Sequence, residues 1–202
     1  MRALVTGAGK RLGRAMALYL AGRGYDVAVH YAASRAGADS VVAEIRAMGR
    51  NAVALRADLL SDAETEALVP RATEALGGAL SVLVNNASIF EYDTVHSATR
   101  QSWDRHFGSN LRAPFLLTQS FASQAPQATT DSNGEPMSQA LIVNMIDQRV
   151  QKLTPEFMTY TLAKMGLWAL TQTAAQALAP HIRVNGIGPG PTMQGARQSD
   201  GH

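Results

Sequence analysis

Residues 2–13 read RALVTGAGKRLG, an apolar run that passes through a glycine-rich turn into a helical pattern. RALVT is typical of a buried strand, and apolar residues recur at helical spacing from Arg11 to Ala21. A turn placed between a strand and a helix brings backbone N–H groups and the positive end of the helix dipole towards a phosphate. Neither the P-loop nor G-x-G-x-x-G is matched, because Lys10 precedes the last glycine and Gly13 falls one place late. The stretch predicts the first βα unit of a dinucleotide-binding fold, with a purely structural tight turn as the alternative.

The rest of the chain repeats this alternation of short β-branched runs and longer helical patterns, which indicates a parallel α/β sheet. We expect a single-domain Rossmann-type doubly wound sheet of six strands over residues 1–202. A polar segment, 125–137, and the end after residue 187 are predicted to be loops. The further strands are expected at 25–31, 52–57, 80–87, 140–146 and 182–187. The further helices are expected at 40–48, 61–76, 101–123 and 155–178. Ser61 and Glu64 form a candidate capping box at the start of the second of these helices, and Pro114 is expected to kink the third.

Composition excludes several classes of function. The 202 residues are 46% hydrophobic and 17% charged, as in globular proteins, and a net charge of +2 is too small to indicate a nucleic-acid partner. The absence of cysteine excludes disulfides and thiolate sites, and the five histidines lack metal-ligand spacing, so no metal is expected. No stretch is long and apolar enough to span a membrane, and the first apolar run leaves no room for a signal peptide. A cytoplasmic protein acting on a small molecule is expected.

Charge near the second strand bears on the choice of cofactor. Folds that bind NAD usually hold the ribose hydroxyls with an acid after this strand. Here the strand ends HYAASR, residues 30–35, and the first acid is Asp39. Arg11 and Arg35 are instead placed to pair with a 2′-phosphate, which an acid would repel. The sequence therefore favours NADP(H) over NAD.

Six ordered motifs make the chain resemble the short-chain dehydrogenases/reductases, and most closely the pteridine reductases, which carry arginine where Arg11 stands. The motifs are TGAGKRLG at 6–13, ADL at 57–59, NNAS at 85–88, Asn110, Tyr160 with Lys164, and IGPGPT at 187–192, while HYAAS at 30–34 resembles the second-strand end of the pteridine reductases. Ala33 departs from that pattern, because those reductases have a basic residue there. Arg35 is the candidate substitute.

This resemblance assigns cofactor contacts residue by residue. It implies that the pyrophosphate and 2′-phosphate contact Gly7, Arg11, Leu12 and Gly13, that the cofactor contacts Tyr31 and Ser34 at the end of the second strand, and that the adenine contacts Asp58 and Leu59. It also implies that the ribose and nicotinamide contact Asn86, Ala87, Ser88, Tyr160 and Lys164, and that the nicotinamide amide contacts Pro189 and Gly190.

Tyr160 and Lys164 are the candidate proton-transfer pair. A free phenol titrates near about 10, and a neighbouring ammonium favours the phenolate, so we expect Lys164 to lower the Tyr160 pKa. Their spacing of four puts both on one helix face, although Y-x-x-x-K alone is more often a surface pair. Asn110 is either a satisfied buried polar group or, by the resemblance, the holder of a water that relays protons through Lys164.

Asp147, thirteen residues before the tyrosine, stands where most of the family has serine. An ionised carboxylate only accepts hydrogen bonds and would repel a developing alkoxide, whereas it can accept from the amino groups of a nitrogen heterocycle. Pteridine reductases carry aspartate here, and Phe90 occupies the place of their pterin-stacking phenylalanine. With Arg11, these residues predict reduction of a pterin, dihydropterin or dihydrofolate, with Tyr160 as proton donor.

Two alternatives stay open at this point. One is an NADP-dependent reductase of another small carbonyl or imine compound, with Asp147 protonated by burial. The other is a cofactor-binding but inactive or truncated homologue, because the family normally continues with a substrate-covering helix and a seventh strand that we expect to be missing here. The resemblance also implies a homo-oligomer, a dimer or tetramer, in which the helices carrying Asn110 and Tyr160 pair with a second copy.

Overall fold

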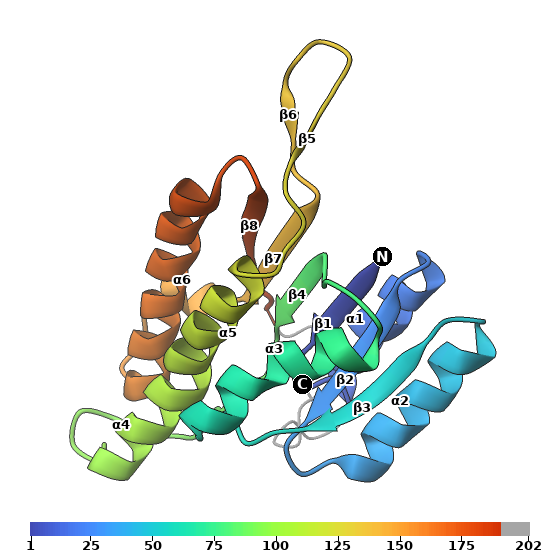
Figure 1. Cartoon of the computed structure of the whole chain (residues 1–202). Coiled ribbons are helices and arrows are strands. Elements are labelled where there is room, and N and C mark those ends of the chain that lie inside the picture. The colour runs from blue at the N-terminus through green and yellow to red at the C-terminus, as the bar shows by residue number, and fades with distance from the viewer. Residues whose placement is uncertain (191–202) are drawn as a thin grey trace.

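A computed structural model describes residues 1–190 and contains a six-stranded sheet between two layers of helices (Figure 1). The strand order is β3-β2-β1-β4-β7-β8, and every pairing of neighbours is parallel. The strands of this sheet are β1 (Arg2–Val5), β2 (Asp26–Tyr31), β3 (Ala52–Arg56), β4 (Val82–Asn85), β7 (Ala140–Met145) and β8 (Ile182–Ile187). The α-helices are α1 (Arg11–Gly22), α2 (Arg35–Ala47), α3 (Asp62–Ala75), α4 (Arg100–Phe107), α5 (Ala113–Ala122) and α6 (Met158–Leu178). The predicted Rossmann-type sheet is confirmed.

Alternation along β1 divides the core between the two faces of the sheet. Successive strand residues point to opposite faces, so Ala3 and Val5 pack with α1 and α2, while Leu4 packs with α3 and α5. All three side chains are fully buried. A strand covered on both faces is apolar along its length, which is why the alternation of a half-exposed strand is missing from RALV.

The strand order reverses at β1 and β4, which are paired neighbours although the chain visits β2 and β3 between them. The loops that follow these strands run towards opposite sides and leave a crevice at the carboxyl ends, the usual ligand site of such sheets. The predicted site residues at the ends of β1, β2, β4 and β7 are therefore brought to one edge.

Two predicted helices have different boundaries in the structure. The helix expected over 101–123 is split into α4 and α5 by a π-helical segment η1, Gly108–Arg112. Pro114 lies in the first turn of α5, and since proline has no N–H and its ring collides with the carbonyl four residues back, the wider turn falls just before it. The predicted kink thus precedes the proline. The α2 helix begins at Arg35 rather than Ser40.

The predicted start of the helix at Pro155 is wrong. A 3-10 turn η2, Gln148–Val150, follows β7, and α6 begins only at Met158. Phe157 has a left-handed φ of 57°, and its N–H donates to the Asp93 carbonyl, so the chain changes direction there before helical bonding begins.

The polar segment 125–137 is not simply a loop. It contains a hairpin of β5 (Thr129–Thr130) and β6 (Pro136–Met137), which projects from the amino end of β7, far from the carboxyl-end crevice (Figure 1). Asp131 holds the turn by accepting the N–H groups of Asn133 and Glu135 through Oδ1. The sequence signal was weak because such a short ladder carries no hydrophobic alternation. The predicted terminal loop lies outside the described residues from 191 onward.

Candidate active site

A cleft of about 730 Å³ lies at the carboxyl ends of the strands. Within residues 1–190, its walls include every predicted site residue except Asn110 and Arg35. These are Gly7, Arg11, Leu12, Gly13, Tyr31, Ser34, Asp58, Leu59, Asn86, Ala87, Ser88, Phe90, Asp147, Tyr160, Lys164, Pro189 and Gly190.

The glycine turn fits against the end of β4 so closely that two positions tolerate no side chain. Gly7 has a left-handed φ of 63°. A Cβ on Gly13 would lie 2.3 Å from the Gly7 carbonyl oxygen and 2.6 Å from the Asn86 amide nitrogen. The turn can therefore bring its backbone close to a ligand only with glycine at both places.

Two side chains that the sequence did not single out hold this turn. Thr6 Oγ1 accepts hydrogen bonds from the N–H groups of Asn86 and Ala87, each at 2.9 Å, which ties the end of β1 to the end of β4. His30 Nδ1 accepts from Gly7 N at 3.0 Å, and its Nε2 lies 3.1 Å from the Ala57 carbonyl, to which it donates. Burial lowers the pKa of His30 to about 4, so the ring is neutral at pH 7.

The cations of the cleft differ in part from those predicted. Arg11, Lys10 and Arg56 line it, together with Ser34 and Ala33. Arg35, the proposed substitute for a basic residue at 33, is absent from the described lining. Its side chain is 80% exposed and pairs with Asp39 at 3.5 Å along the surface of α2. Because α2 begins at Arg35, the side chain leaves along the helix, and its predicted phosphate role is not supported.

Tyr160, Lys164 and Asp147 converge at the inner end of the cleft. Tyr160 Oη donates to Asp147 Oδ2 at 2.8 Å, and Asp147 Oδ1 accepts the Arg149 N–H at 2.8 Å. Lys164 Nζ donates to the Met145 carbonyl at 2.7 Å and lies 5.7 Å from the centroid of the Tyr160 ring. Both side chains are buried, on one face of α6.

The expected lowering of the Tyr160 pKa is wrong for this arrangement. Burial raises the pKa of the phenol above its ordinary value, and the charge and hydrogen bond of Asp147 raise it further. Burial also lowers the pKa of Lys164 to about 8, against the opposing attraction of Asp147. The carboxylate, in direct contact with the phenol, outweighs the more distant ammonium. The tyrosine therefore holds its proton firmly.

Asn110 is a satisfied buried polar group in η1. Its Oδ1 accepts the Ile89 N–H at 2.9 Å, and its Nδ2 donates to the Ile89 carbonyl at 2.8 Å. The side chain thus fixes the segment between Ser88 and Phe90. Its backbone carbonyl lacks the usual helical donor four residues on, because that residue is Pro114.

Phe90 belongs to an aromatic cluster at the mouth of the cleft. Its ring is 43% exposed and packs edge-on to Tyr160, with centroids 4.6 Å apart. Phe157 stacks on it at 4.2 Å, and Tyr92 meets Phe157 at 5.3 Å. The role of Phe157 was missed, because only the turn before α6 brings it back over residue 90.

Comparison with known proteins gives the family. The short chain dehydrogenase family model matches residues 1–201. The chain belongs to the short-chain dehydrogenase family. A short-chain dehydrogenase/reductase of Armillaria gallica is 37% identical over 191 residues, covering 94% of this chain and 70% of that protein. The 3-oxoacyl-[acyl-carrier-protein] reductase FabG of Staphylococcus aureus is 35% identical, covering 93% and 73%.

Solved structures of other short-chain dehydrogenases superpose well on this one. FolM alternative dihydrofolate reductase 1 from Brucella suis, in complex with NADP, has a TM-score of 0.86 and 41% identity, covering 96% of this chain and 76% of that one. A short-chain dehydrogenase from Burkholderia cenocepacia, also with NADP, has a TM-score of 0.85 and 34% identity, covering 94% and 73%.

In this short-chain dehydrogenase, Asp147 stands in place of the serine that most of the family has before the tyrosine, and it accepts a hydrogen bond from the Tyr160 hydroxyl. The replacement changes the chemistry of the site, because a serine hydroxyl donates to a substrate oxygen whereas a carboxylate can only accept. The described residues hold no group of three acidic or histidine side chains suited to a metal, and no helix among them is long and apolar enough to cross a membrane.

Proposed function

We propose that the protein is an NADPH-dependent reductase of a pterin, dihydropterin or dihydrofolate ring, with Tyr160 as the proton donor. The observation that carries this proposal is the contact between Tyr160 Oη and Asp147 Oδ2 beside the exposed Phe90 ring. It combines a held proton, an acceptor for amino groups and an apolar face, which together match a flat nitrogen heterocycle.

The cofactor is NADP(H), and the cleft fits it. Three solved relatives were crystallised with NADP. Gly13 packs against the Gly7 carbonyl and the Asn86 amide, which fixes the glycine turn beside the cleft, and Lys10 and Arg11 supply positive charge to the lining of the cleft. Bound NADPH supplies the hydride. Pro189 and Gly190 also line the cleft, and by the family resemblance they would contact the nicotinamide amide.

The proton that accompanies the hydride comes from the chain's own residues. Tyr160 Oη carries it, and Asp147 keeps it there until a ring nitrogen takes it. A phenolate then forms beside Asp147, and the nearby Lys164 ammonium offsets that charge. We assign to the Asn110 carbonyl, which has no helical donor from Pro114, the relay water that would return a proton through Lys164.

The relatives support both leading alternatives. The likeness to FolM favours dihydrofolate or a pterin, whereas the likeness to FabG favours a ketone. Loss of NADPH absorbance with dihydrobiopterin and dihydrofolate, compared with a panel of ketones that includes an acetoacetyl thioester, distinguishes them. We expect turnover of a reduced or oxidised pterin at a higher kcat/KM than of any ketone. Turnover of ketones alone would reject the proposal, and cofactor binding without any turnover would indicate the inactive homologue.

We further propose a dimer or tetramer in which α4, α5 and α6 face a second copy. Trp103, Phe115 and Leu162 on these helices are each more than two-fifths exposed, at 45%, 45% and 42%. Exposed apolar side chains gathered on neighbouring helices are typical of an interface. Sedimentation equilibrium of the protein tests this oligomeric state. A cytoplasmic location stays a prediction from the sequence.

A further inference from the structure

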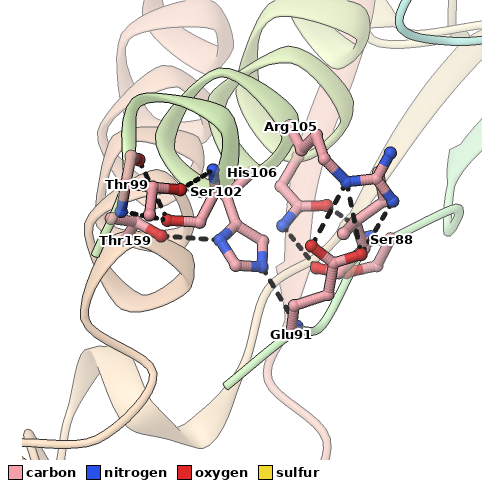
Figure 2. Close-up of polar contacts among 9 residues, drawn as sticks. Ser88, Glu91, Thr99, Ser102, Arg105, His106 and Thr159 are labelled. Carbon is pink, nitrogen blue, oxygen red and sulfur yellow. Dashed lines mark hydrogen bonds and ion pairs between the residues drawn. The ribbon is translucent and has the colours of Figure 1, made fainter. Parts of the chain in front are cut away.

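His106 is a fully buried histidine that the proposed chemistry does not use. It lies on α4, outside the cleft, between two segments that both carry site residues. Figure 2 shows its ring between Thr159 on one side and Glu91 on the other. Glu91 N donates to His106 Nε2 at 3.1 Å, and His106 Nδ1 lies 2.6 Å from Thr159 Oγ1.

These bonds have one consistent set of proton directions. Since Nε2 accepts from a backbone N–H, the proton of the neutral ring is on Nδ1, which donates to Thr159 Oγ1. The Thr159 hydroxyl in turn donates to Asp93 Oδ2, and the other oxygen of Asp93 accepts the Thr159 N–H at 3.1 Å. Burial lowers the pKa of His106, which keeps the ring neutral as this arrangement requires.

His106 thus forms a hydrogen-bonded bridge between Glu91 and Thr159, and each of these two residues is next to a residue of the site. Glu91 follows Phe90, and Thr159 precedes Tyr160. Arg105, the neighbour of His106 on α4, also binds the Glu91 carboxylate, with its closest contact at 2.7 Å (Figure 2). Helix α4 therefore holds residue 91 by both its backbone and its side chain, and holds the first turn of α6 through the same histidine.

We propose that His106 is a positioning residue that sets the Phe90 ring against the Tyr160 phenol and so shapes the slot for a flat heterocycle. Phe90 is half-exposed at the cleft mouth, and both of its covalent neighbours are held, Ile89 by Asn110 and Glu91 by His106. Without an acceptor at Nε2, the half-buried Glu91 N–H loses its His106 partner and the segment shifts to regain one. The catalytic part of this proposal rests on the proposed function, whereas the structural part does not.

The test compares three variants of the whole chain. His106→Phe keeps a ring but removes the acceptor, and His106→Gln restores an amide oxygen that can accept from Glu91 N. His96→Phe, at an exposed histidine, is the matched control. The first measurement is hydrogen exchange of the Glu91 amide, which needs no substrate. We expect exchange about tenfold faster in His106→Phe, with protection recovered in His106→Gln and unchanged in the control.

The second measurement is steady-state kinetics with dihydrobiopterin, together with NADPH binding. We expect KM for the pterin to rise about tenfold in His106→Phe, with kcat within about threefold and the NADPH Kd unchanged. His106→Gln should recover most of the loss. A merely structural role would lower kcat and NADPH affinity together with the rise in KM, and that result overturns the proposal.

Two further outcomes are decisive. If His106→Phe does not fold, Thr159→Val tests the other end of the contact by removing the hydroxyl that His106 Nδ1 binds, and an unchanged KM then overturns the proposal. If the wild type reduces no pterin, the proposed function fails, but faster exchange of Glu91 in His106→Phe still supports the bridge. Equal protection of Glu91 in both His106 variants and the wild type overturns the bridge itself.

Discussion

At the scale of single residues, Asp147 decides what Tyr160 can do. Its Oδ2 accepts a hydrogen bond from the phenol at 2.8 Å, and Asp147 adds to the rise in the Tyr160 pKa that burial causes. A phenol with a raised pKa is protonated at pH 7, which is the state that the proton donor of a reductase needs, whereas the reverse oxidation needs the phenolate. The same shift makes the phenol a weaker acid, so Asp147 opposes the transfer of the proton as well as holding it. The same contact makes Asp147 and Tyr160 a coupled pair, so each is expected to alter the effect of changing the other.

Tyr160→Phe removes the proton donor but keeps the ring that packs against Phe90. We expect kcat to fall by about 10³-fold, within the usual contribution of a general acid. The NADPH Kd should change little, because Lys164 and the glycine turn are untouched. Stopped-flow turnover and fluorescence titration measure the two. Activity near that of the wild type would mean that another group donates the proton.

Asp147→Ser replaces an acceptor by the hydroxyl donor common in the family. We expect kcat/KM for dihydropterin to fall about tenfold or more, and that for ketones to fall less or rise. Loss of the carboxylate also lowers the Tyr160 pKa, so the alkaline limb of the pH–rate profile should move to lower pH. Asp147→Asn, which keeps the shape, is the control for charge. A greater loss with ketones than with pterins would reject the electrostatic argument.

At the scale of elements, the glycine turn and the start of α6 are built by contacts between distant segments. Thr6 and His30 hold the turn from β1 and β2, and the Asp93 carbonyl receives the N–H of Phe157 before α6 begins. Such contacts make the turn rigid before any ligand arrives, which lowers the entropic cost of binding.

Gly13→Ala tests the fit of the turn. The new Cβ would lie 2.3 Å from the Gly7 carbonyl oxygen, so backbone must move and the pyrophosphate cradle opens. We expect the NADPH Kd to rise by about tenfold or more. Gly22→Ala is the matched control, because its Cβ would meet nothing within 4 Å and α1 should gain about 0.5 kcal/mol of stability. Isothermal titration and thermal melts measure both. Equal NADPH affinities in the two variants would contradict the prediction that the turn at Gly13 binds the pyrophosphate.

At the scale of the whole molecule, the cleft exists because the strand order reverses between β1 and β4. Loops after β1, β2, β4 and β7 then meet at one edge, and α6 crosses them with Tyr160 and Lys164 facing inward. His30 links this edge from β2 to the turn after β1 and to Ala57 after β3. Its protonation would therefore loosen several strands together.

We expect global stability to fall as pH falls because of His30. Its folded pKa of about 4 lies below the unfolded value of 6.5, so the unfolded chain binds the proton first. The contribution is complete above about pH 6.5 and is lost progressively down to about pH 4, roughly 3 kcal/mol in total. Urea unfolding of the wild type and of His30→Gln at several pH values measures it. The variant should show a shallower slope over this window, and parallel slopes would contradict the assignment.

Most of the fold followed from local patterns, whereas the site followed only in part. The strands at 2–5 and 182–187 and the glycines at 7 and 13 were predictable, because periodicity and steric limits act over a few residues. The pairing of α4 with the segment around Glu91, and the return of Phe157 onto Phe90, join residues far apart in sequence. A local sequence pattern covers only a few neighbouring residues, so it could not indicate these two long-range contacts.

The sequence alone determined the parallel sheet, the glycine turn between β1 and α1 and the Tyr160–Lys164 pair on one helix face. These depend on side-chain period, backbone sterics and helix geometry, which are short-range properties. The tertiary structure alone decided that Asp147 holds the tyrosine proton, that Arg35 turns away from the cleft, and that His106 joins two halves of the site. Those features depend on burial and on contacts across the fold, and both the protonation of a group and the direction of its side chain are set by the neighbours that folding brings to it.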